Sequence, residues 1–202
     1  LNNLIQFKQS RSDNMLVMIG ASASGKTEIY IKLIQEALSE NKQVLYLLPE
    51  IALTPQMVQR LQERFGKRVA VYHSKFSIHE RTEVWQNILS NNENAGVVVG
   101  ARSSLFLPFK KLGLIVVDEE HEVSYKQFDP SPRYHARDTA ILLGHLHGAK
   151  TLLGSATPSI ESFFNANHDK YGLVHLKKRY GDVQMPEIQL VDIKEKHRKK
   201  RM

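Results

Sequence analysis

The sequence predicts an α/β fold, a doubly wound and mainly parallel sheet flanked by helices. Apolar, β-branched runs alternate with amphipathic stretches along the chain, as they do where helices connect parallel strands. Most runs are solidly apolar rather than alternating, which is typical of strands covered on both faces. Polar strings at 20–27, 118–121 and 154–159 each follow such a run. They are therefore expected at the carboxyl edge of the sheet, where open parallel sheets bind ligands.

The expected strands are short and end close to these strings or to turns. In chain order they are Leu16–Ile19, Val44–Leu48, Val69–Tyr72, Gly96–Val99, Leu114–Val117, Thr151–Leu153, Leu173–Leu176 and Ile188–Val191.

Capping residues and prolines mark the expected helix starts. Thr54-Pro55 places an N-cap residue before a proline at the first helical position, and predicts a helix to about Phe65. The sequence Ser-Ile-His-Glu at 77–80 is a capping box and predicts a helix to about Leu89. Thr157-Pro158 repeats the cap-then-proline signal before a helix over 159–166.

Two further helices and one long loop complete the expected layout. Helices are expected from Glu28 onward and over Tyr134–Leu146. The segment Tyr125–Pro132 contains two prolines and two aromatic residues without periodicity, so it is expected to be a loop.

Composition is that of an ordinary globular domain, with 42% hydrophobic and 24% charged residues in 202. No apolar run approaches the roughly 20 residues that span a bilayer, so no membrane association is expected. The absence of cysteine excludes disulfides and thiolate zinc sites in this piece and suits a cytoplasmic protein. Because the chain begins with Leu, it is interpreted as an excised piece: 1–14 a truncated lead-in, 15–193 the domain, and 194–202 a connector.

The net charge of +7 is concentrated at the end of the chain. The last nine residues carry +5, so residues 1–193 carry only +2. This basic stretch is interpreted as a solvated connector. Nucleic-acid binding therefore has to be argued from other residues.

The string at 20–27 matches GxxxxGK[ST], a strand-to-helix loop whose backbone N–H groups cradle phosphates. Lys26 would reach the β- and γ-phosphates, and the Thr27 hydroxyl would ligate Mg²⁺. The expected cradle residues are Gly20, Ala21, Ser22, Ala23, Ser24, Gly25, Lys26 and Thr27.

Asp118 and Glu119 follow the apolar strand over 114–117. Asp118 would hold Mg²⁺, and Glu119 would orient the attacking water, because phosphoryl transfer depends on positioning and charge stabilisation. Lys26, Asp118 and Glu119 are the expected catalytic residues. His121, His145 and His147 are interpreted as helix-face residues rather than zinc ligands, because partners at metal-ligand spacing are missing.

DEEH together with SAT resembles superfamily 2 helicases, and longer strings are similar to the PriA family of primosomal replication-restart helicases. They agree in order over most of the chain from Leu16 onward. The strings are LLPEIALTPQ at 47–56, VYHSKFS at 71–77, GARSSLFLPF at 100–109, DEEHEVSYKQ at 118–127, PRYHARDTA at 132–140 and LLGSATPSIES at 152–162.

The resemblance implies a RecA-like P-loop NTPase lobe that binds ATP and Mg²⁺. It implies that His121, Gln127, Ser155 and Thr157 couple the nucleotide to DNA. The loop over 125–137 resembles an aromatic-rich coupling loop, in which aromatic rings stack on bases and basic groups meet phosphates. Its aromatic residues are Tyr125, Phe128 and Tyr134, and its basic residues are Lys126, Arg133 and Arg137. The strand-tip residues Thr54, Lys75, Arg102 and Ser103 match backbone-tracking motifs.

For the whole protein, the resemblance implies a 3′-to-5′ DNA helicase that acts on single-stranded and forked DNA with primosome partners. A second lobe, its arginine finger and a zinc module are expected outside this chain, which is expected to be monomeric and weakly active. The cradle departs from the family at Ala21-Ser22-Ala23, and only Gln6 and Gln9 are candidates for the adenine-reading glutamine.

Two other functions use the same residues. A small-molecule or nucleotide kinase would use the cradle but leave the SAT string without a role. A degenerate lobe that only binds DNA or protein would not need Lys26, Thr27, Asp118 and Glu119 intact.

Overall fold

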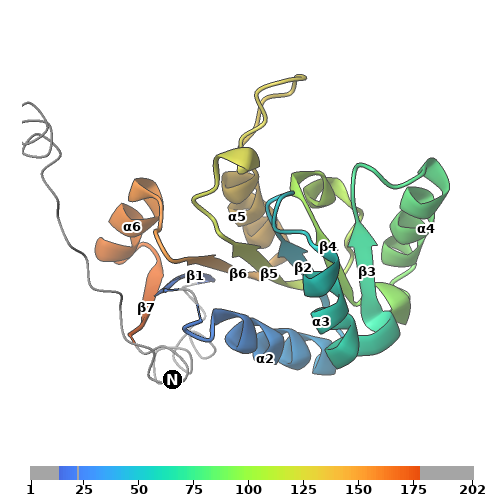
Figure 1. The fold of residues 1–202 in the computed structure, drawn as a ribbon, viewed down its shortest axis with the longest axis horizontal. Helices are drawn as coiled ribbons and strands as arrows, with labels where there is room; N and C mark the ends of the chain where they lie inside the picture. The colour runs from blue at the N-terminus through green and yellow to red at the C-terminus, as the bar shows by residue number, and fades with distance from the viewer. Residues whose placement is uncertain (1–13, 22, 178–202) are drawn as a thin grey trace, which may run out of the picture.

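The computed structural model describes residues 14–21 and 23–177 (Figure 1). Within them, seven strands form one sheet with the order β3-β4-β2-β5-β6-β1-β7. All neighbouring strands are parallel. The strands are β1 (Met15–Gly20), β2 (Gln43–Leu47), β3 (Val69–Tyr72), β4 (Val97–Gly100), β5 (Leu112–Asp118), β6 (Lys150–Ser155) and β7 (Gly172–Leu176). The predicted doubly wound α/β fold is confirmed.

Helices connect the strands. The α-helices are α2 (Lys26–Ser39), α3 (Pro55–Phe65), α4 (Ile78–Leu89), α5 (Ala136–His147) and α6 (Ile160–Asn167). Short 3₁₀ turns are η1 (Gly66–Arg68), η2 (Glu93–Ala95), η3 (Arg102–Phe106) and η4 (Val123–Tyr125). The strand predicted over 188–191 and the candidate glutamines Gln6 and Gln9 lie outside the described residues.

The sheet separates two apolar layers, because successive side chains of a strand point to opposite faces. In β1, Leu16 and Met18 belong to the layer that includes apolar residues of α2 and α3, whereas Val17 belongs to the opposite layer, which includes residues of α4, α5 and α6. Figure 1 shows α2 and α3 on one side of the sheet and α5 and α6 on the other. This coverage of both faces explains why the strands are apolar throughout.

Two helix starts follow the sequence prediction. The Thr54 side chain accepts a hydrogen bond from the Met57 N–H, with a proline at the next position. Ser77 and Glu80 form the reciprocal capping box predicted for α4.

The start of α6 was predicted wrongly. The N-cap is Ser159, two residues after the predicted cap Thr157, and its side chain accepts a hydrogen bond from the Ser162 N–H. The N–H of Thr157 donates instead to the Ser155 hydroxyl. The cap-then-proline rule failed because a second hydroxyl residue, Ser159, follows the proline, and its side chain caps the helix instead of that of Thr157.

Candidate functional site

The three polar strings meet at one edge of the sheet. The strands that carry them, β5, β6 and β1, are consecutive neighbours. In the register, Ile19 lies opposite Ser155, and Asp118 lies opposite Gly154. The carboxyl ends of these parallel strands therefore bring the phosphate-loop, acidic and SAT residues together.

The loop between β1 and α2 has the backbone of a phosphate cradle. Gly25 adopts a left-handed conformation with φ of 88° directly before the first helical residue, Lys26. The Ser24 N–H closes a turn on the Ala21 carbonyl at 3.1 Å. Ala23 is also left-handed, with φ of 62°, which is costly for a residue with a side chain. Ser22 lies outside the described residues.

Two polar groups in the cradle fit a phosphate. The Ser24 hydroxyl is buried and has no hydrogen-bond partner among the described residues, so it can donate to an anion. The Lys26 ammonium donates to the Gly20 carbonyl at 2.6 Å and, more weakly, to the Ala21 carbonyl at 3.5 Å, and keeps a third donor. Together with the N-terminus of α2, these groups suit a triphosphate.

Asp118 ends β5 and is almost fully buried. Its carboxylate accepts from the hydroxyls of Tyr30 and Tyr46 and from the Glu119 N–H. Burial raises the pKa of Asp118, as does the neighbouring Glu119, while the two tyrosine hydroxyls and Lys26 oppose that rise. The influence of Lys26 on this pKa reflects how close the phosphate loop and the acidic motif lie.

Glu119 and His121 occupy the turn after β5. Glu119 adopts a left-handed backbone with φ of 49° and keeps its side chain 37% exposed. Its carboxylate lies 3.7 Å from His121, whose Nδ1 lies 2.7 Å from the Ser155 hydroxyl. His121 is thus in a turn, not on the predicted helix face. His145 and His147 lie on α5 as expected.

The expected coupling residues fall into two groups. Ser155 links His121 to the N–H of Thr157, so these three residues form one chain of hydrogen bonds. Gln127 lies apart from it, and its side chain donates to the carbonyls of Pro130 and Pro132.

Glu120 was missed by the sequence reasoning. Its side chain is fully buried and accepts from the Ser159 N–H and hydroxyl, from the Ser162 hydroxyl and from Arg137. These bonds join the acidic motif to the start of α6. The only signal in the sequence was its place within DEEH. A run of adjacent acidic residues does not show which of their carboxylates is buried.

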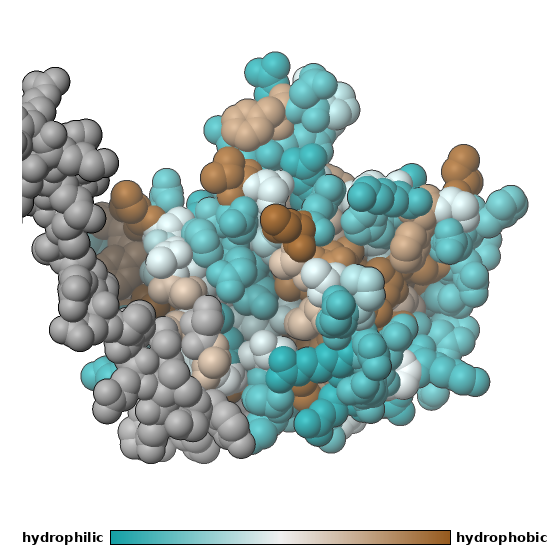
Figure 2. All heavy atoms as spheres, viewed as in Figure 1, coloured by the Kyte–Doolittle hydropathy of each residue, from teal (hydrophilic) through white to brown (hydrophobic). Residues whose placement is uncertain are grey.

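The loop after the acidic motif forms a narrow hairpin that projects from the body next to α5 (Figure 1). Lys126 and His135 pair across it, and the Gln127 N–H donates to the Tyr134 carbonyl. Phe128 is 57% exposed, with the Lys126 ammonium 4.9 Å from its ring centre. Figure 2 shows mainly hydrophilic residues over this hairpin.

The other two aromatic residues of the loop are less available than predicted. Tyr125 is 1% exposed, and its hydroxyl donates to the carbonyls of Leu47 and Asp118, so it packs the loop down instead of offering a stacking face. Tyr134 is partly buried and meets Phe106 edge-on at 5.1 Å. Of the three predicted stacking rings, Phe128 is the exposed one.

The predicted DNA contacts also differ in exposure. Lys75, Lys126 and Arg133 are exposed, and Ser103 is partly buried. Arg102 reaches back to the carbonyls of Ser124 and Lys126, and thereby anchors the base of the hairpin. The Thr54 hydroxyl serves as the α3 cap described above.

Arg137 corrects one of these expectations. Its side chain is 9% exposed, and its guanidinium bonds to Glu120, Asp138 and Ser159. An arginine held inward by carboxylates is not presented to a phosphate backbone. It turns inward because Glu120 would otherwise be a buried charge without a cation.

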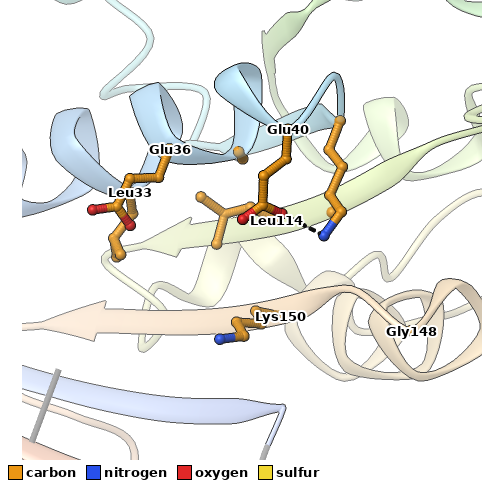
Figure 3. A pocket seen from close by; sticks show the side chains of 9 residues that line it. Leu33, Glu36, Glu40, Leu114, Gly148 and Lys150 are labelled. Carbon is orange, nitrogen blue, oxygen red and sulfur yellow. Dashed lines mark hydrogen bonds and ion pairs between the residues drawn. The ribbon is translucent and has the colours of Figure 1, made fainter. Parts of the chain in front are cut away.

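A hollow of about 310 Å³ lies at the opposite edge of the sheet (Figure 3). It is lined by the end of α2 and the starts of β5 and β6. Glu40 and Lys42 pair across one wall at 2.6 Å. Its mixed charges and its distance from the phosphate loop separate it from the site described here.

Within residues 14–21 and 23–177, no group of three or more His, Cys, Asp or Glu side chains is arranged to hold a metal ion. No helix in this part of the chain is long and apolar enough to cross a membrane.

The fold and site define a P-loop nucleotide-binding lobe of the RecA-like type. The family model for DEAD/DEAH box helicases matches residues 5–164, so the chain belongs to that family. Membership implies nucleotide binding with a metal ion, generally Mg²⁺.

Relatives that match most of the chain are named Replication restart protein PriA. The chain is 46% identical over 189 residues to the protein of Bacillus subtilis (strain 168), covering 94% of this chain and 23% of the relative. It is 48% identical over 184 residues to that of Rickettsia felis, covering 91% of this chain and 28% of the relative. The chain thus spans about a quarter of the length of these relatives.

Solved structures share the fold. A RecG protein bound to a three-way DNA junction matches with a TM-score of 0.58 and 22% identity, over 87% of this chain and 23% of that one. A DEAD box protein from Methanococcus jannaschii matches with a TM-score of 0.59 and 17% identity, over 87% and 48% of the two chains. The predicted RecA-like architecture is confirmed.

Proposed function

We propose that this chain is the ATP-binding and hydrolysing lobe of a 3′-to-5′ DNA helicase that acts in replication restart. One observation carries the proposal. Direct hydrogen bonds connect the elements that carry the three strings: Tyr30, on the helix that begins at Lys26, donates to Asp118, and His121 of the acidic motif bonds to Ser155 of SAT. The name of the relatives supports the replication-restart role.

Each residue has a defined task in this proposal. Lys26 and the backbone N–H groups of the loop would hold the phosphates, and Thr27 and Asp118 would hold Mg²⁺, which would supply positive charge beside the phosphates when bound. Glu119 orients the attacking water, for which its exposed carboxylate beside buried Asp118 is well placed.

The hydrogen-bond chain from His121 through Ser155 to Thr157 would transmit the state of the nucleotide to the DNA track. Phe128 would stack on a base, while exposed Lys75, Lys126 and Arg133 would meet phosphates of single-stranded or forked DNA. Arg102 and Ser103 would act beside them at the hairpin base. We expect the protein to act in the cytoplasm with primosome partners, and we expect this lobe to be monomeric. The second lobe and the zinc module would be other parts of the same protein.

The test measures ATP hydrolysis by the intact protein with and without single-stranded DNA. Glu119→Gln should keep nucleotide affinity but lower turnover by about 10²–10⁴-fold, the range of a lost general base. Lys26→Ala should lower nucleotide affinity itself. Equal loss of binding and turnover in Glu119→Gln would show that its role is misassigned.

Two further measurements separate the alternatives. The 202-residue chain alone should turn over slowly, because an arginine finger from another lobe is worth about 10³–10⁵ in rate. Full, DNA-stimulated activity of this chain alone would contradict the proposal. Phosphate transfer to small hydroxyl acceptors would favour a kinase, and unchanged nucleotide affinity in Lys26→Ala would favour a non-catalytic lobe.

A further inference from the structure

Two buried tyrosines hold the carboxylate of Asp118 from both sides. The Tyr30 hydroxyl donates to one carboxylate oxygen at 3.2 Å, and the Tyr46 hydroxyl donates to the other at 3.1 Å. Both side chains are 0% exposed. Neither residue belongs to the polar strings, and neither is assigned a contact with the nucleotide, the metal or DNA in the function proposed above.

The two hydroxyls come from different elements, α2 and β2, and their rings meet edge-on at 5.8 Å with an interplanar angle of 77°. The carboxylate is therefore fixed by both the helix after the phosphate loop and a neighbouring strand. A swing of Asp118 would break at least one of these bonds in a dry interior, where an unpaired polar group is costly.

Gly154 leaves room for one of these hydroxyls. A Cβ atom built on Gly154 would collide with the hydroxyl of Tyr30 and would lie 3.5 Å from Asp118. The absence of a side chain at Gly154 thus allows Tyr30 to reach Asp118. Three motifs meet at this point: the phosphate-loop helix, the acidic strand and the SAT strand.

The acceptor capacity of Asp118 is nearly filled. A carboxylate offers about four lone-pair sites. Tyr30, Tyr46 and the Glu119 N–H occupy three of them. About one site remains, so Asp118 has only one direction left in which to engage a cation or a water bound to it.

We propose that Tyr30 and Tyr46 are positioning residues that orient Asp118 toward Mg²⁺ and thereby set the affinity of the site for the metal. This inference rests on the proposed function, in which Asp118 holds Mg²⁺. Groups that hydrogen-bond to a metal ligand fix its orientation, and their loss lowers metal affinity by about 10–100-fold.

The experiment titrates Mg²⁺ into the intact protein and follows the binding of a fluorescent ATP analogue, so that its readout is independent of turnover. Tyr30→Phe and Tyr46→Phe should each raise the half-saturating Mg²⁺ concentration by about 10-fold. Binding of the analogue in EDTA should change by less than about twofold, because neither hydroxyl faces the phosphates in the proposed arrangement.

Tyr72→Phe is the matched control. Tyr72 is also buried, but it lies on the edge strand β3, and its hydroxyl accepts a hydrogen bond from Arg81 of α4. It should leave the Mg²⁺ titration unchanged. Thermal unfolding in EDTA checks that each variant is folded, and either of the two site variants alone suffices for the test.

Asp118→Asn separates the two levels of the argument. If Asp118→Asn shifts the Mg²⁺ titration but both tyrosine variants match the wild type, the positioning role is overturned and the proposed function stands. If Asp118→Asn also leaves the titration unchanged, the assignment of Asp118 to the metal fails, and this inference fails with it.

Discussion

The ion pair between Arg137 and Glu120 allows a direct test of whether Arg137 stabilises the fold or contacts DNA. Arg137→Met removes the cation beside a carboxylate that has 0% exposure. Breaking a buried pair on one side costs about 3–5 kcal/mol, because a charge is left without its partner. Here Glu120 keeps three donors from Ser159 and Ser162, at 2.7, 3.0 and 2.9 Å. We therefore expect the lower end, about 3 kcal/mol of unfolding free energy.

Urea unfolding followed by circular dichroism measures this loss, with an unchanged m-value as the sign of an unaltered transition. Glu120→Gln should also destabilise, because Arg137 then loses its buried anion and keeps only the exposed carboxylates of Asp138 and Glu161. The double variant should then lose less than the sum, with a coupling energy of about 2 kcal/mol. Additive losses, or a loss below about 1 kcal/mol in Arg137→Met, would refute the reasoning.

DNA binding supplies the second half of the test. The salt dependence of single-strand affinity falls by about 0.7 in logarithmic slope for each phosphate contact removed. Arg133→Ala should show that fall, because Arg133 is exposed on the hairpin. Arg137→Met should keep the wild-type slope. A reduced slope in a stably folded Arg137→Met variant would show that Arg137 contacts a DNA phosphate.

Three further predictions concern stability, each measured by chemical unfolding. Ala23→Gly should stabilise by about 0.5 kcal/mol, because relief of a left-handed alanine exceeds the entropic cost of glycine; a loss of stability would contradict the strained backbone. Thr54→Ala should cost about 1 kcal/mol and Thr54→Ser almost nothing, since only the former removes the α3 cap. Burial lowers the pKa of His135, as does Arg137. Near the ordinary pKa of histidine, His135 is therefore protonated more in the unfolded chain than in the folded one, and stability should fall as the pH drops from 7.5 to 5.5. His135→Gln should flatten that fall, and parallel pH profiles would count against it.

The sequence was sufficient for the parts of the fold that depend on local chemistry. Solid apolar runs predicted the described strands, and caps at Thr54 and Ser77 predicted two helix starts at the correct residue. The catalytic assignments to Lys26, Asp118 and Glu119 remain predictions, which the structure supports by bringing their strands to one edge. Such features are readable because each arises within a few residues of the chain.

The inward roles could not be read in the same way. Arg137 resembled a phosphate contact because the sequence placed it at the end of a basic, aromatic loop, and Tyr125 resembled a stacking ring for the same reason; in the structure Arg137 lies in the first turn of α5. Whether a side chain in such a loop faces solvent is decided by a partner far along the chain: Glu120 for Arg137, and the carbonyl of Leu47 for Tyr125. Local pattern contains no information about partners 17 or 78 residues away.

The same reasoning explains how the acidic motif can serve several tasks with adjacent residues. Successive residues of a strand and its turn point in different directions, so Asp118, Glu119 and Glu120 meet different surroundings. Asp118 is held by tyrosine hydroxyls, Glu119 stays partly exposed beside His121, and Glu120 is bonded to the start of α6. A change at Glu120 should therefore displace the SAT segment and α6 before it alters the charge at the phosphates. The three carboxylates of the motif thus have three different surroundings, and Glu120 is the one that anchors the motif to α6 and, through Arg137, to α5.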